Sequence, residues 1–115
     1  LYALGFNEAA GNFQLANFSG QGLGNDQIQA DGQDGSGTNN ANSSSSAVDG
    51  QSGPRTQMYI FTATTPDRDG TIDADVLYHE CSHGLSIRLH GPQGTLGTGA
   101  QSRGMGEGWA RGEGR

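Results

Sequence analysis

Two histidines and a glutamate occur within five residues in the motif HECSH, residues 79 to 83. On an α-helix, with about 100° per residue, His79 and His83 differ by about 40° and lie one turn apart. Both imidazoles can therefore reach one point above the same helix face, and neutral imidazole is a good ligand for Zn²⁺. A catalytic zinc site typically has three protein ligands and keeps one position for water, so a third ligand must come from elsewhere in the chain.

Glu80 follows His79 and is offset from it by about 100° around the helix, which places its carboxylate beside a metal rather than on it. There it can accept a proton from a water molecule whose pKa the metal lowers to about 7. These are the groups that hydrolysis of a peptide bond requires. Cys81 points to the other side of the helix, and we interpret it as core packing, because a free Cys commonly behaves as a small buried hydrophobe.

A solvated helix face could carry the same residue types by chance, which is a risk for every short motif. The helix, however, is predicted independently, because apolar residues recur at three- and four-residue spacing from about Asp73 to Leu89. Thr71 or Asp73 can cap its start, and Gly91-Pro92 can end it. The recurring residues, which predict one buried stripe on the side away from the two histidines, are Val76, Leu77, Cys81, Leu85 and Leu89.

The rest of the sequence predicts short elements joined by Gly-, Asp- and Asn-rich turns. The best strand candidate is a run of bulky and β-branched residues. In chain order we expect short strands and turns over 1–23, an ordered loop with at most brief strands over 25–42, a mobile surface loop over 43–53, a strand over 57–62, a turn over 66–70, a loop over 92–99 and the start of a second helix over 104–109.

The composition limits what the chain can be. At 115 residues it is at most one small domain or a piece of a larger one, and 31% hydrophobic residues with 21 glycines predict a thin core. A net charge of -6 argues against a nucleic-acid partner and against an anionic membrane surface, and no apolar run is long enough to span a bilayer. The chain starts at Leu1 without Met and ends without a structural stop, so we expect a fragment.

Longer motifs surround HECSH. The stretch HECSHGLSIRL followed by GMGEGW, and preceded by QDGSGTNNAN and TPDRDG, resembles the catalytic domain of the fungalysins, secreted fungal metalloendopeptidases of peptidase family M36. The resemblance runs through nearly the whole chain. It implies an α+β, thermolysin-like (gluzincin) fold, of which this chain is a partial domain. The expected parts are a strand- and loop-rich region over 1–70, the active-site helix over 71–91, and a loop with the third-ligand segment over 92–115.

The resemblance also implies roles for particular residues. In the fungalysins the glutamate of GMGEGW is the third zinc ligand, and it matches Glu107. The implied site therefore has His79, His83 and Glu107 as ligands of one Zn²⁺ per chain, with Glu80 as the general base. A further segment resembles the edge strand on which the substrate peptide is laid by β-augmentation. Its residues are Asn39, Asn40, Ala41 and Asn42.

The function implied by the resemblance is that of a secreted, extracellular zinc metalloendopeptidase. Its partners would be protein or peptide substrates and its own N-terminal propeptide, since the family is synthesised as zymogens. Asn17 and Asn42 begin N-glycosylation patterns, which have a meaning only in a secreted protein. The transition-state histidine of the family and the walls of its specificity pocket lie further toward the C-terminus, so residues 1–115 alone are expected to be inactive.

Of three departures from the family pattern, the serine tract and Arg111 motivate an alternative, an inactive homologue that keeps the fold and zinc, whereas the change at Cys81 is expected to be tolerated. Cys81 replaces the tyrosine of HEYTH or HEYSH, and Ser43 to Ser46 replace an aromatic and proline-containing stretch. Ala110-Arg111 replaces the Ser-Asp that follows GMGEGW, whose acid orients a zinc-binding histidine.

The second alternative is an Asp-, Asn- and Gly-rich calcium-binding or adhesion module. Asp67, Asp69 and Gly70 match the middle of an EF-hand loop. The ends do not match, because the first ligand position is Thr65 and the twelfth, where a bidentate Glu belongs, is Val76.

Overall fold

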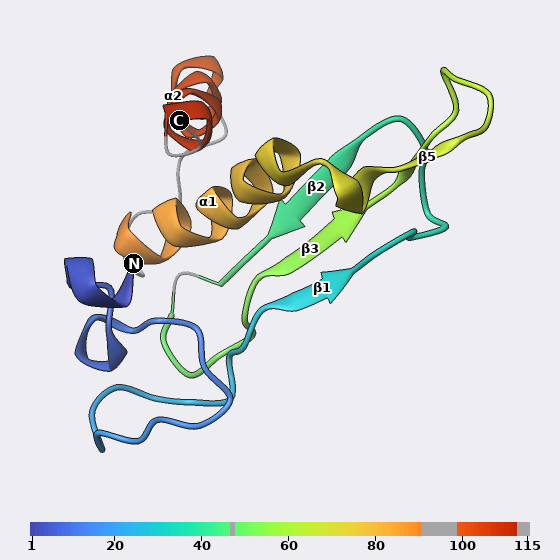
Figure 1. Cartoon of the computed structure of the whole chain (residues 1–115). Coiled ribbons are helices and arrows are strands. Elements are labelled where there is room, and N and C mark those ends of the chain that lie inside the picture. The colour runs from blue at the N-terminus through green and yellow to red at the C-terminus, as the bar shows by residue number, and fades with distance from the viewer. Residues whose placement is uncertain (47, 91–98, 113–115) are drawn as a thin grey trace.

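The computed structural model describes residues 1–46, 48–90 and 99–112, and it shows a small α+β arrangement with one helix lying along a sheet (Figure 1). The sheet has three strands in the order β1-β3-β2. Strand β3 runs parallel to β1 and antiparallel to β2, so β3 is central and β2 is an edge strand among the described residues. The bounds are β1 (Gln29–Asp31), β2 (Ala41–Ser44) and β3 (Arg55–Met58).

The single strand predicted over 57–62 is divided between two sheets. After β3 the chain forms β4 (Ile60–Phe61), which pairs with β5 (Arg68–Asp69) in an antiparallel ribbon. Tyr59 lies between the two sheets with 7% of its surface exposed. Its backbone N–H donates to Asn40 and its carbonyl accepts from Gly70, so the chain changes hydrogen-bonding partners at this residue.

The mobile loop predicted over 43–53 is also corrected by the structure. Ser43 and Ser44 belong to β2, where they pair with Thr56 and Arg55 of β3. The serine run lacks an apolar pattern, but β3 supplies hydrogen-bonding partners for its backbone, which satisfies the N–H and C=O groups on that side of β2. Beyond the serines, Asp49 accepts hydrogen bonds from Leu23 and Arg88.

Helix α1 (Ala74–His90) confirms the predicted helix within one residue at each end. Its start is capped by Asp73, whose carboxylate accepts from the N–H groups of Asp75 and Val76 at 3.0 and 3.3 Å. The helix lies beside β2 and forms more contacts with it than with β3 (Figure 1). The core therefore sits between α1 and the β2–β3 side of the sheet, where Met58 and Thr56 are buried.

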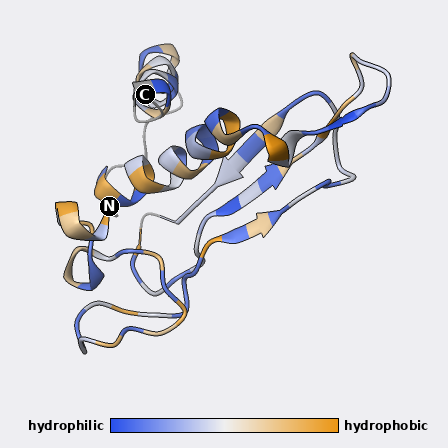
Figure 2. Ribbon diagram, viewed as in Figure 1, coloured by the Kyte–Doolittle hydropathy of each residue, from blue (hydrophilic) through white to orange (hydrophobic). Residues whose placement is uncertain are grey.

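The predicted buried stripe of α1 is wrong in part. The buried residues of the helix are Glu80, Gly84 and Arg88, whereas Leu89 is 62% exposed and Leu85 is only half-buried. The buried line is close to the sheet because Gly84 has no side chain: a Cβ there would lie 2.8 Å from the Pro54 side chain. Hydrophobic segments are correspondingly scattered along the chain and are interrupted by hydrophilic ones (Figure 2).

Helix α2 (Ala100–Gly112) is longer than the short start predicted over 104–109. Four glycines disfavour a helix here, but α2 packs on α1, and its buried positions Gly106 and Ala110 have small side chains that permit close approach. The predicted loop over 92–99 falls almost entirely on residues 91–98, outside the described residues.

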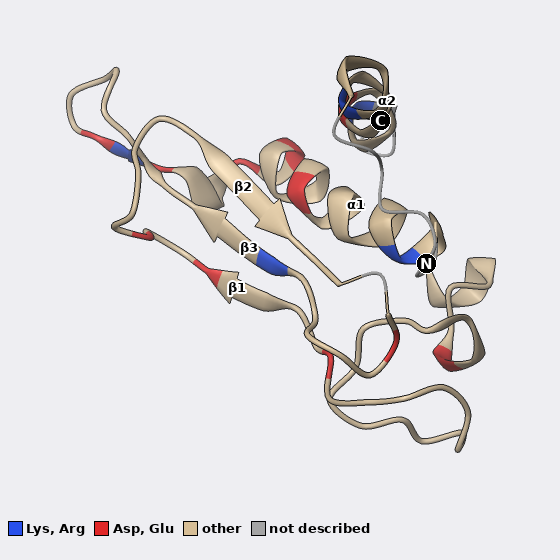
Figure 3. Cartoon of the chain, turned by 180° about the vertical axis from the view of Figure 1, so that it is seen from behind, with Lys and Arg blue, Asp and Glu red and all other residues tan. Residues whose placement is uncertain are grey.

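The described chain carries few basic residues. Basic residues lie at separate places on β3, near β5, on α1 and on α2, with acidic residues between them (Figure 3). Short 3₁₀ helices complete the fold at Tyr2–Leu4, Glu8–Ala10 and Gly70–Ile72. A search of the described helices for one long and apolar enough to cross a membrane finds no candidate.

Candidate metal centre

Three of the four residues expected at the site converge on one point between α1 and α2. His79 and His83 come from successive turns of α1, with their Nε2 atoms 3.1 Å apart. Glu107 of α2 places Oε2 3.2 Å from Nε2 of His79 and Oε1 3.6 Å from Nε2 of His83. Within the described part of the chain, this is the one group of three or more His, Cys, Asp or Glu side chains whose ligand atoms come within 4.8 Å of one another.

These separations fit a small divalent cation. Ligand atoms held at 2.0 to 2.1 Å from one tetrahedral ion are about 3.3 Å from each other. The two imidazole nitrogens are 3.1 Å apart, and each faces a different oxygen of the Glu107 carboxylate, at 3.2 and 3.6 Å. The chemistry of the donors also fits, because two imidazoles and a carboxylate are zinc ligands. Three ligands from protein leave one position of a tetrahedral site for another molecule.

The two imidazoles are better shielded from water than the carboxylate. The side chains of His79 and His83 are 21% and 19% exposed, against 61% for Glu107. Burial lowers the pKa of His83 below its ordinary value; the Glu107 charge opposes this shift and His79 adds to it. A lowered pKa keeps the imidazole neutral near pH 7, which is the form that binds a metal.

Glu80 lies on a different face of α1 from the two histidines, as its position in the helix predicts. It is only 6% exposed. Burial raises the pKa of its carboxyl group above the ordinary value; the neighbouring His79 opposes the rise, and the Glu107 charge adds to it. A carboxylate with a raised pKa is a stronger base than an exposed one, so the environment of Glu80 suits proton transfer.

The segment expected to bind substrate enters the edge strand beside α1. Ala41 and Asn42 are the first residues of β2, and the carbonyl of Asn40 accepts from Tyr59 N–H at 3.3 Å. Asn39 has a φ of +56°, and its side chain accepts from Thr62 N–H at 2.8 Å. The four residues thus form the turn and the first part of the strand that lies next to the helix carrying Glu80.

The loop compared with an EF-hand has a different structure. Between Thr65 and Val76 the chain forms β5, a 3₁₀ helix and the cap of α1. The Asp69 carboxylate accepts hydrogen bonds from Thr71 N–H at 2.9 Å and from Gln33 at 2.7 Å, and these bonds lower its pKa. Asp73 caps the helix. Two of the acidic groups are therefore used to start helices.

Cys81 is half-buried, and burial raises the pKa of its thiol, with the Glu80 charge as a smaller cause. A raised pKa keeps the thiol neutral, in agreement with a packing role. Sequence reasoning missed Arg88, which is 5% exposed and binds several loops. The available signal was an arginine four residues after Gly84 and eight after Glu80, which places it on the same side of the helix.

Known proteins resemble this chain over almost its whole length. The sequence profile of a family described as Fungalysin metallopeptidase (M36) matches residues 1–112. An Extracellular metalloproteinase MEP of Pyricularia oryzae is 54% identical over 112 residues, which is 96% of this chain and 17% of that protein. The Extracellular metalloproteinase mep of Aspergillus flavus is 53% identical over 111 residues, 95% of this chain and 17% of that protein.

A third relative, Extracellular metalloproteinase 10 of Coccidioides posadasii, is 52% identical over 111 residues and is again covered over 17% of its length. The chain thus spans about a sixth of the length of these relatives. A family profile that covers 112 of 115 residues and relatives at this identity leave one assignment. Together with a metallopeptidase-type cluster of two histidines and a glutamate, they show that the chain belongs to the fungalysin (M36) metallopeptidase family.

Proposed function

We propose that the chain is the metal-binding part of a secreted zinc metalloendopeptidase with a thermolysin-like catalytic domain. His79, His83 and Glu107 are the proposed zinc ligands. The observation that carries this proposal is that the Nε2 atoms of His79 and His83 on α1 lie 3.1 Å apart and each faces an oxygen of the Glu107 carboxylate on α2, at 3.2 and 3.6 Å. The extracellular relatives support secretion.

The proposed chemistry uses Glu80 as the proton carrier. When bound, zinc polarises the scissile carbonyl and lowers the pKa of a water molecule. Glu80 takes the proton of the attacking water on its carboxylate and returns it to the leaving amine. Its low exposure supports this role, because a carboxylate shielded from solvent has a raised pKa and keeps an accepted proton until it is transferred.

The proposed substrate is an extended stretch of a protein or peptide laid along β2. This strand is paired on one side with β3 and lies beside α1. Among the described residues no strand pairs with its other edge, and a peptide that adds there would form backbone hydrogen bonds next to Glu80. An N-terminal propeptide, also proposed, would occupy the same edge before it is removed.

The test uses the complete gene product, because the relatives are much longer than this chain. Glu80→Gln is expected to lower kcat on a protein substrate by roughly 10²- to 10⁴-fold while zinc content stays at one per chain. His83→Ala is expected to lose zinc as well as activity. Asp75→Asn, an exposed α1 position close in sequence, is the matched control and is expected to change neither.

An inactive homologue is the second candidate, favoured by the Ala110-Arg111 pair that follows the GMGEGW segment. Ala110 is buried against α1 at 2% exposure and offers no polar group to a histidine. Zinc binding by a wild-type protein that does not hydrolyse peptides would support this candidate. A wild-type activity abolished by Glu80→Gln would exclude it, and calcium bound in place of zinc would contradict both.

A further inference from the structure

The side of α1 that faces the sheet carries three buried residues spaced four apart. Glu80, Gly84 and Arg88 are the buried positions of this helix. At 1.5 Å per residue the two charged ends of this line are about 12 Å apart. Gly84 lies between them in close contact with Pro54. A displacement or rotation of α1 against the sheet would therefore move Glu80 and Arg88 together.

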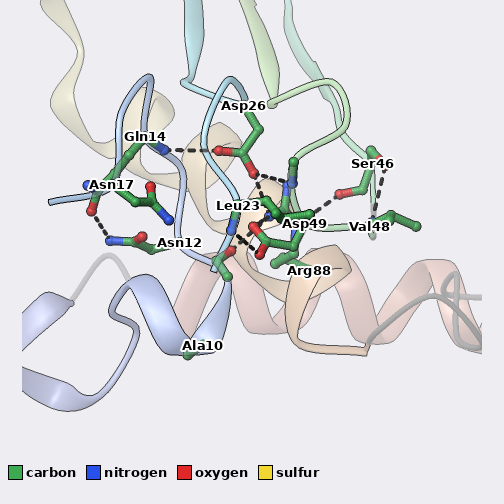
Figure 4. A network of polar contacts seen from close by, with 12 residues as sticks. Ala10, Asn12, Gln14, Asn17, Leu23, Asp26, Ser46, Val48, Asp49 and Arg88 are labelled. Carbon is green, nitrogen blue, oxygen red and sulfur yellow. Dashed lines mark hydrogen bonds and ion pairs between the residues drawn. The ribbon is translucent and has the colours of Figure 1, made fainter. Parts of the chain in front are cut away.

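Arg88 is held by several segments that are distant in sequence (Figure 4). Its Nη1 donates to the Asp26 carboxylate at 2.8 Å, to the Gly11 carbonyl at 2.8 Å and to the Asp49 carboxylate at 3.3 Å. Its Nε donates to the Ser46 carbonyl at 3.2 Å. The guanidinium also lies 4.6 Å from the centre of the Phe13 ring. The Arg88 side chain and its Asp26 partner are 3% and 0% exposed.

The partners of Arg88 are fixed as well. The Asp26 carboxylate accepts from Gln14 N–H at 3.1 Å and from Gly50 N–H at 3.1 Å. Asp49 accepts from Leu23 N–H at 2.7 Å. The cluster therefore connects α1 to the loop over residues 11–26, to Ser46 and to residues 49–50, and hydrogen bonds from Leu23 to Asp49 and from Gly50 to Asp26 connect these segments to one another.

Apolar packing at this end of α1 is loose by comparison. Leu89 is 62% exposed, and two open pockets of about 220 and 360 Å³ lie between Leu85 and the N-terminal segment. Loosely packed apolar side chains tolerate more than one arrangement. Hydrogen bonds to a buried guanidinium fix both direction and distance, so the Arg88 cluster, more than apolar contact, sets where this half of the helix lies.

We infer that Arg88 is a positioning residue for Glu80: anchored by Asp26, it holds α1 at the one distance and rotation from β2 that aims the Glu80 carboxylate at a peptide on that edge. This inference rests on the proposed function. It concerns Glu80 more than zinc, because the three proposed zinc ligands lie on α1 and α2. If these two helices shift together, the distances among the ligands do not change. Glu80 acts across the boundary between α1 and the sheet.

The experiment compares variants of the complete gene product for kcat, KM and zinc affinity. Arg88→Met is expected to lower kcat at least tenfold with zinc affinity and KM within about threefold of the wild type, because small misplacements of a catalytic group cost up to about 10²-fold. Arg88→Lys keeps the charge with fewer donors and is expected to recover part of kcat. Gly84→Ala, which pushes the helix from Pro54 without removing a charge, is expected to reproduce the selective loss of kcat.

Arg55→Met is the matched control. Arg55 also pairs with two carboxylates, Asp31 at 2.7 Å and Asp34 at 3.2 Å, but on the exposed side of β3, and its loss is expected to change none of the three quantities. Wild-type kcat in Arg88→Met and Gly84→Ala, or equal losses of kcat and zinc affinity in both, would overturn the positioning role. If Arg88→Met does not fold, Gly84→Ala and Arg88→Lys decide the question by the same criteria. A zinc-loaded wild type without peptidase activity would instead contradict the proposed function, and the positioning role with it.

Discussion

Helix α1 carries two charged clusters that differ in how far protein groups satisfy one another. At the Arg88 cluster a guanidinium meets two carboxylates and two carbonyls, and the side chains of Arg88 and Asp26 are almost completely buried. At the metal centre two imidazole nitrogens face each other and a carboxylate that is 61% exposed. The first cluster is held together by its own donors and acceptors, with one guanidinium between two carboxylates. The second brings together three electron-pair donors that a cation can bridge.

The carboxyl groups near the two clusters show the same contrast in their pKa values. Near the metal centre, burial raises the pKa of Glu80. In the N-terminal loops that Arg88 holds, hydrogen bonds from Ser19 and Phe18 hold the pKa of Glu8 at about 2. The Glu8 carboxylate is thus surrounded by donors, whereas the main influence on the pKa of Glu80 is burial. The surroundings of Glu8 and Glu80 thus give these two carboxyl groups opposite pKa shifts.

The largest effect on stability is expected from removing one carboxylate of the Arg88 cluster. Asp26→Asn removes the fully buried carboxylate partner of Arg88 and leaves only the longer contact with Asp49 at 3.3 Å. Breaking a buried ion pair typically costs about 3–5 kcal/mol. Glu107→Gln removes a carboxylate that is mostly exposed, which in the absence of metal is expected to change stability by at most about 1 kcal/mol. Urea unfolding of the full chain in the presence of EDTA measures both. Equal effects of the two substitutions would mean that the Arg88 cluster and the candidate metal centre do not differ in how strongly they stabilise the fold.

The next largest effect is expected from zinc binding to His79, His83 and Glu107, which would stabilise the folded chain. At a free zinc concentration of 100 times Kd, zinc is expected to raise the free energy of unfolding by about 2.7 kcal/mol, because it binds the folded chain. Glu107→Gln is expected to shift this response to higher zinc concentrations. Thermal unfolding at several zinc concentrations measures the shift, with calcium as the control ion. Stabilisation by calcium alone would contradict the assignment of this cluster to zinc.

The sequence predicted that His79 and His83 lie close together, because the signals for this are local. His79 and His83 are one helical turn apart, so the periodicity that predicts α1 also places both imidazoles on one face. The cap at Asp73 is equally local. The addition of Glu107 required the family resemblance, since no spacing rule relates residues of two different helices.

The Arg88 cluster and strand β2 could not be predicted from local signals of this kind. Arg88 lies 62 residues from Asp26 and 77 from Gly11, and no periodicity connects them. Strand β2 could not be predicted from its serine run, because it is the pairing with the backbone of β3 that makes this segment a strand. The exposed Leu89 misled the prediction of the buried stripe, because apolar periodicity does not say which half of the stripe another segment covers.

The smallest effect is expected at Glu8, whose carboxylate is surrounded by hydrogen-bond donors. Its carboxylate accepts from Phe18 N–H at 2.9 Å and Ser19 N–H at 2.7 Å, and also from the Ser19 hydroxyl. These bonds lower its pKa from 4.5 to about 2. The group therefore stabilises the folded chain fully above pH 4.5, and this contribution is lost as the pH falls from 4.5 toward 2.

Replacing Glu8 by Gln is accordingly expected to lower the free energy of unfolding at pH 7, and the difference from the wild type is expected to shrink at pH 3. Urea unfolding at the two pH values measures this difference. Asp75→Asn, which changes an exposed carboxylate in the first turn of α1, is the control for a general charge effect and is expected to show little change with pH. A Glu8→Gln difference that is the same at both pH values would mean that the donors around Glu8 favour its neutral form as much as its charged form, and the contrast with Glu80 would then rest on burial alone.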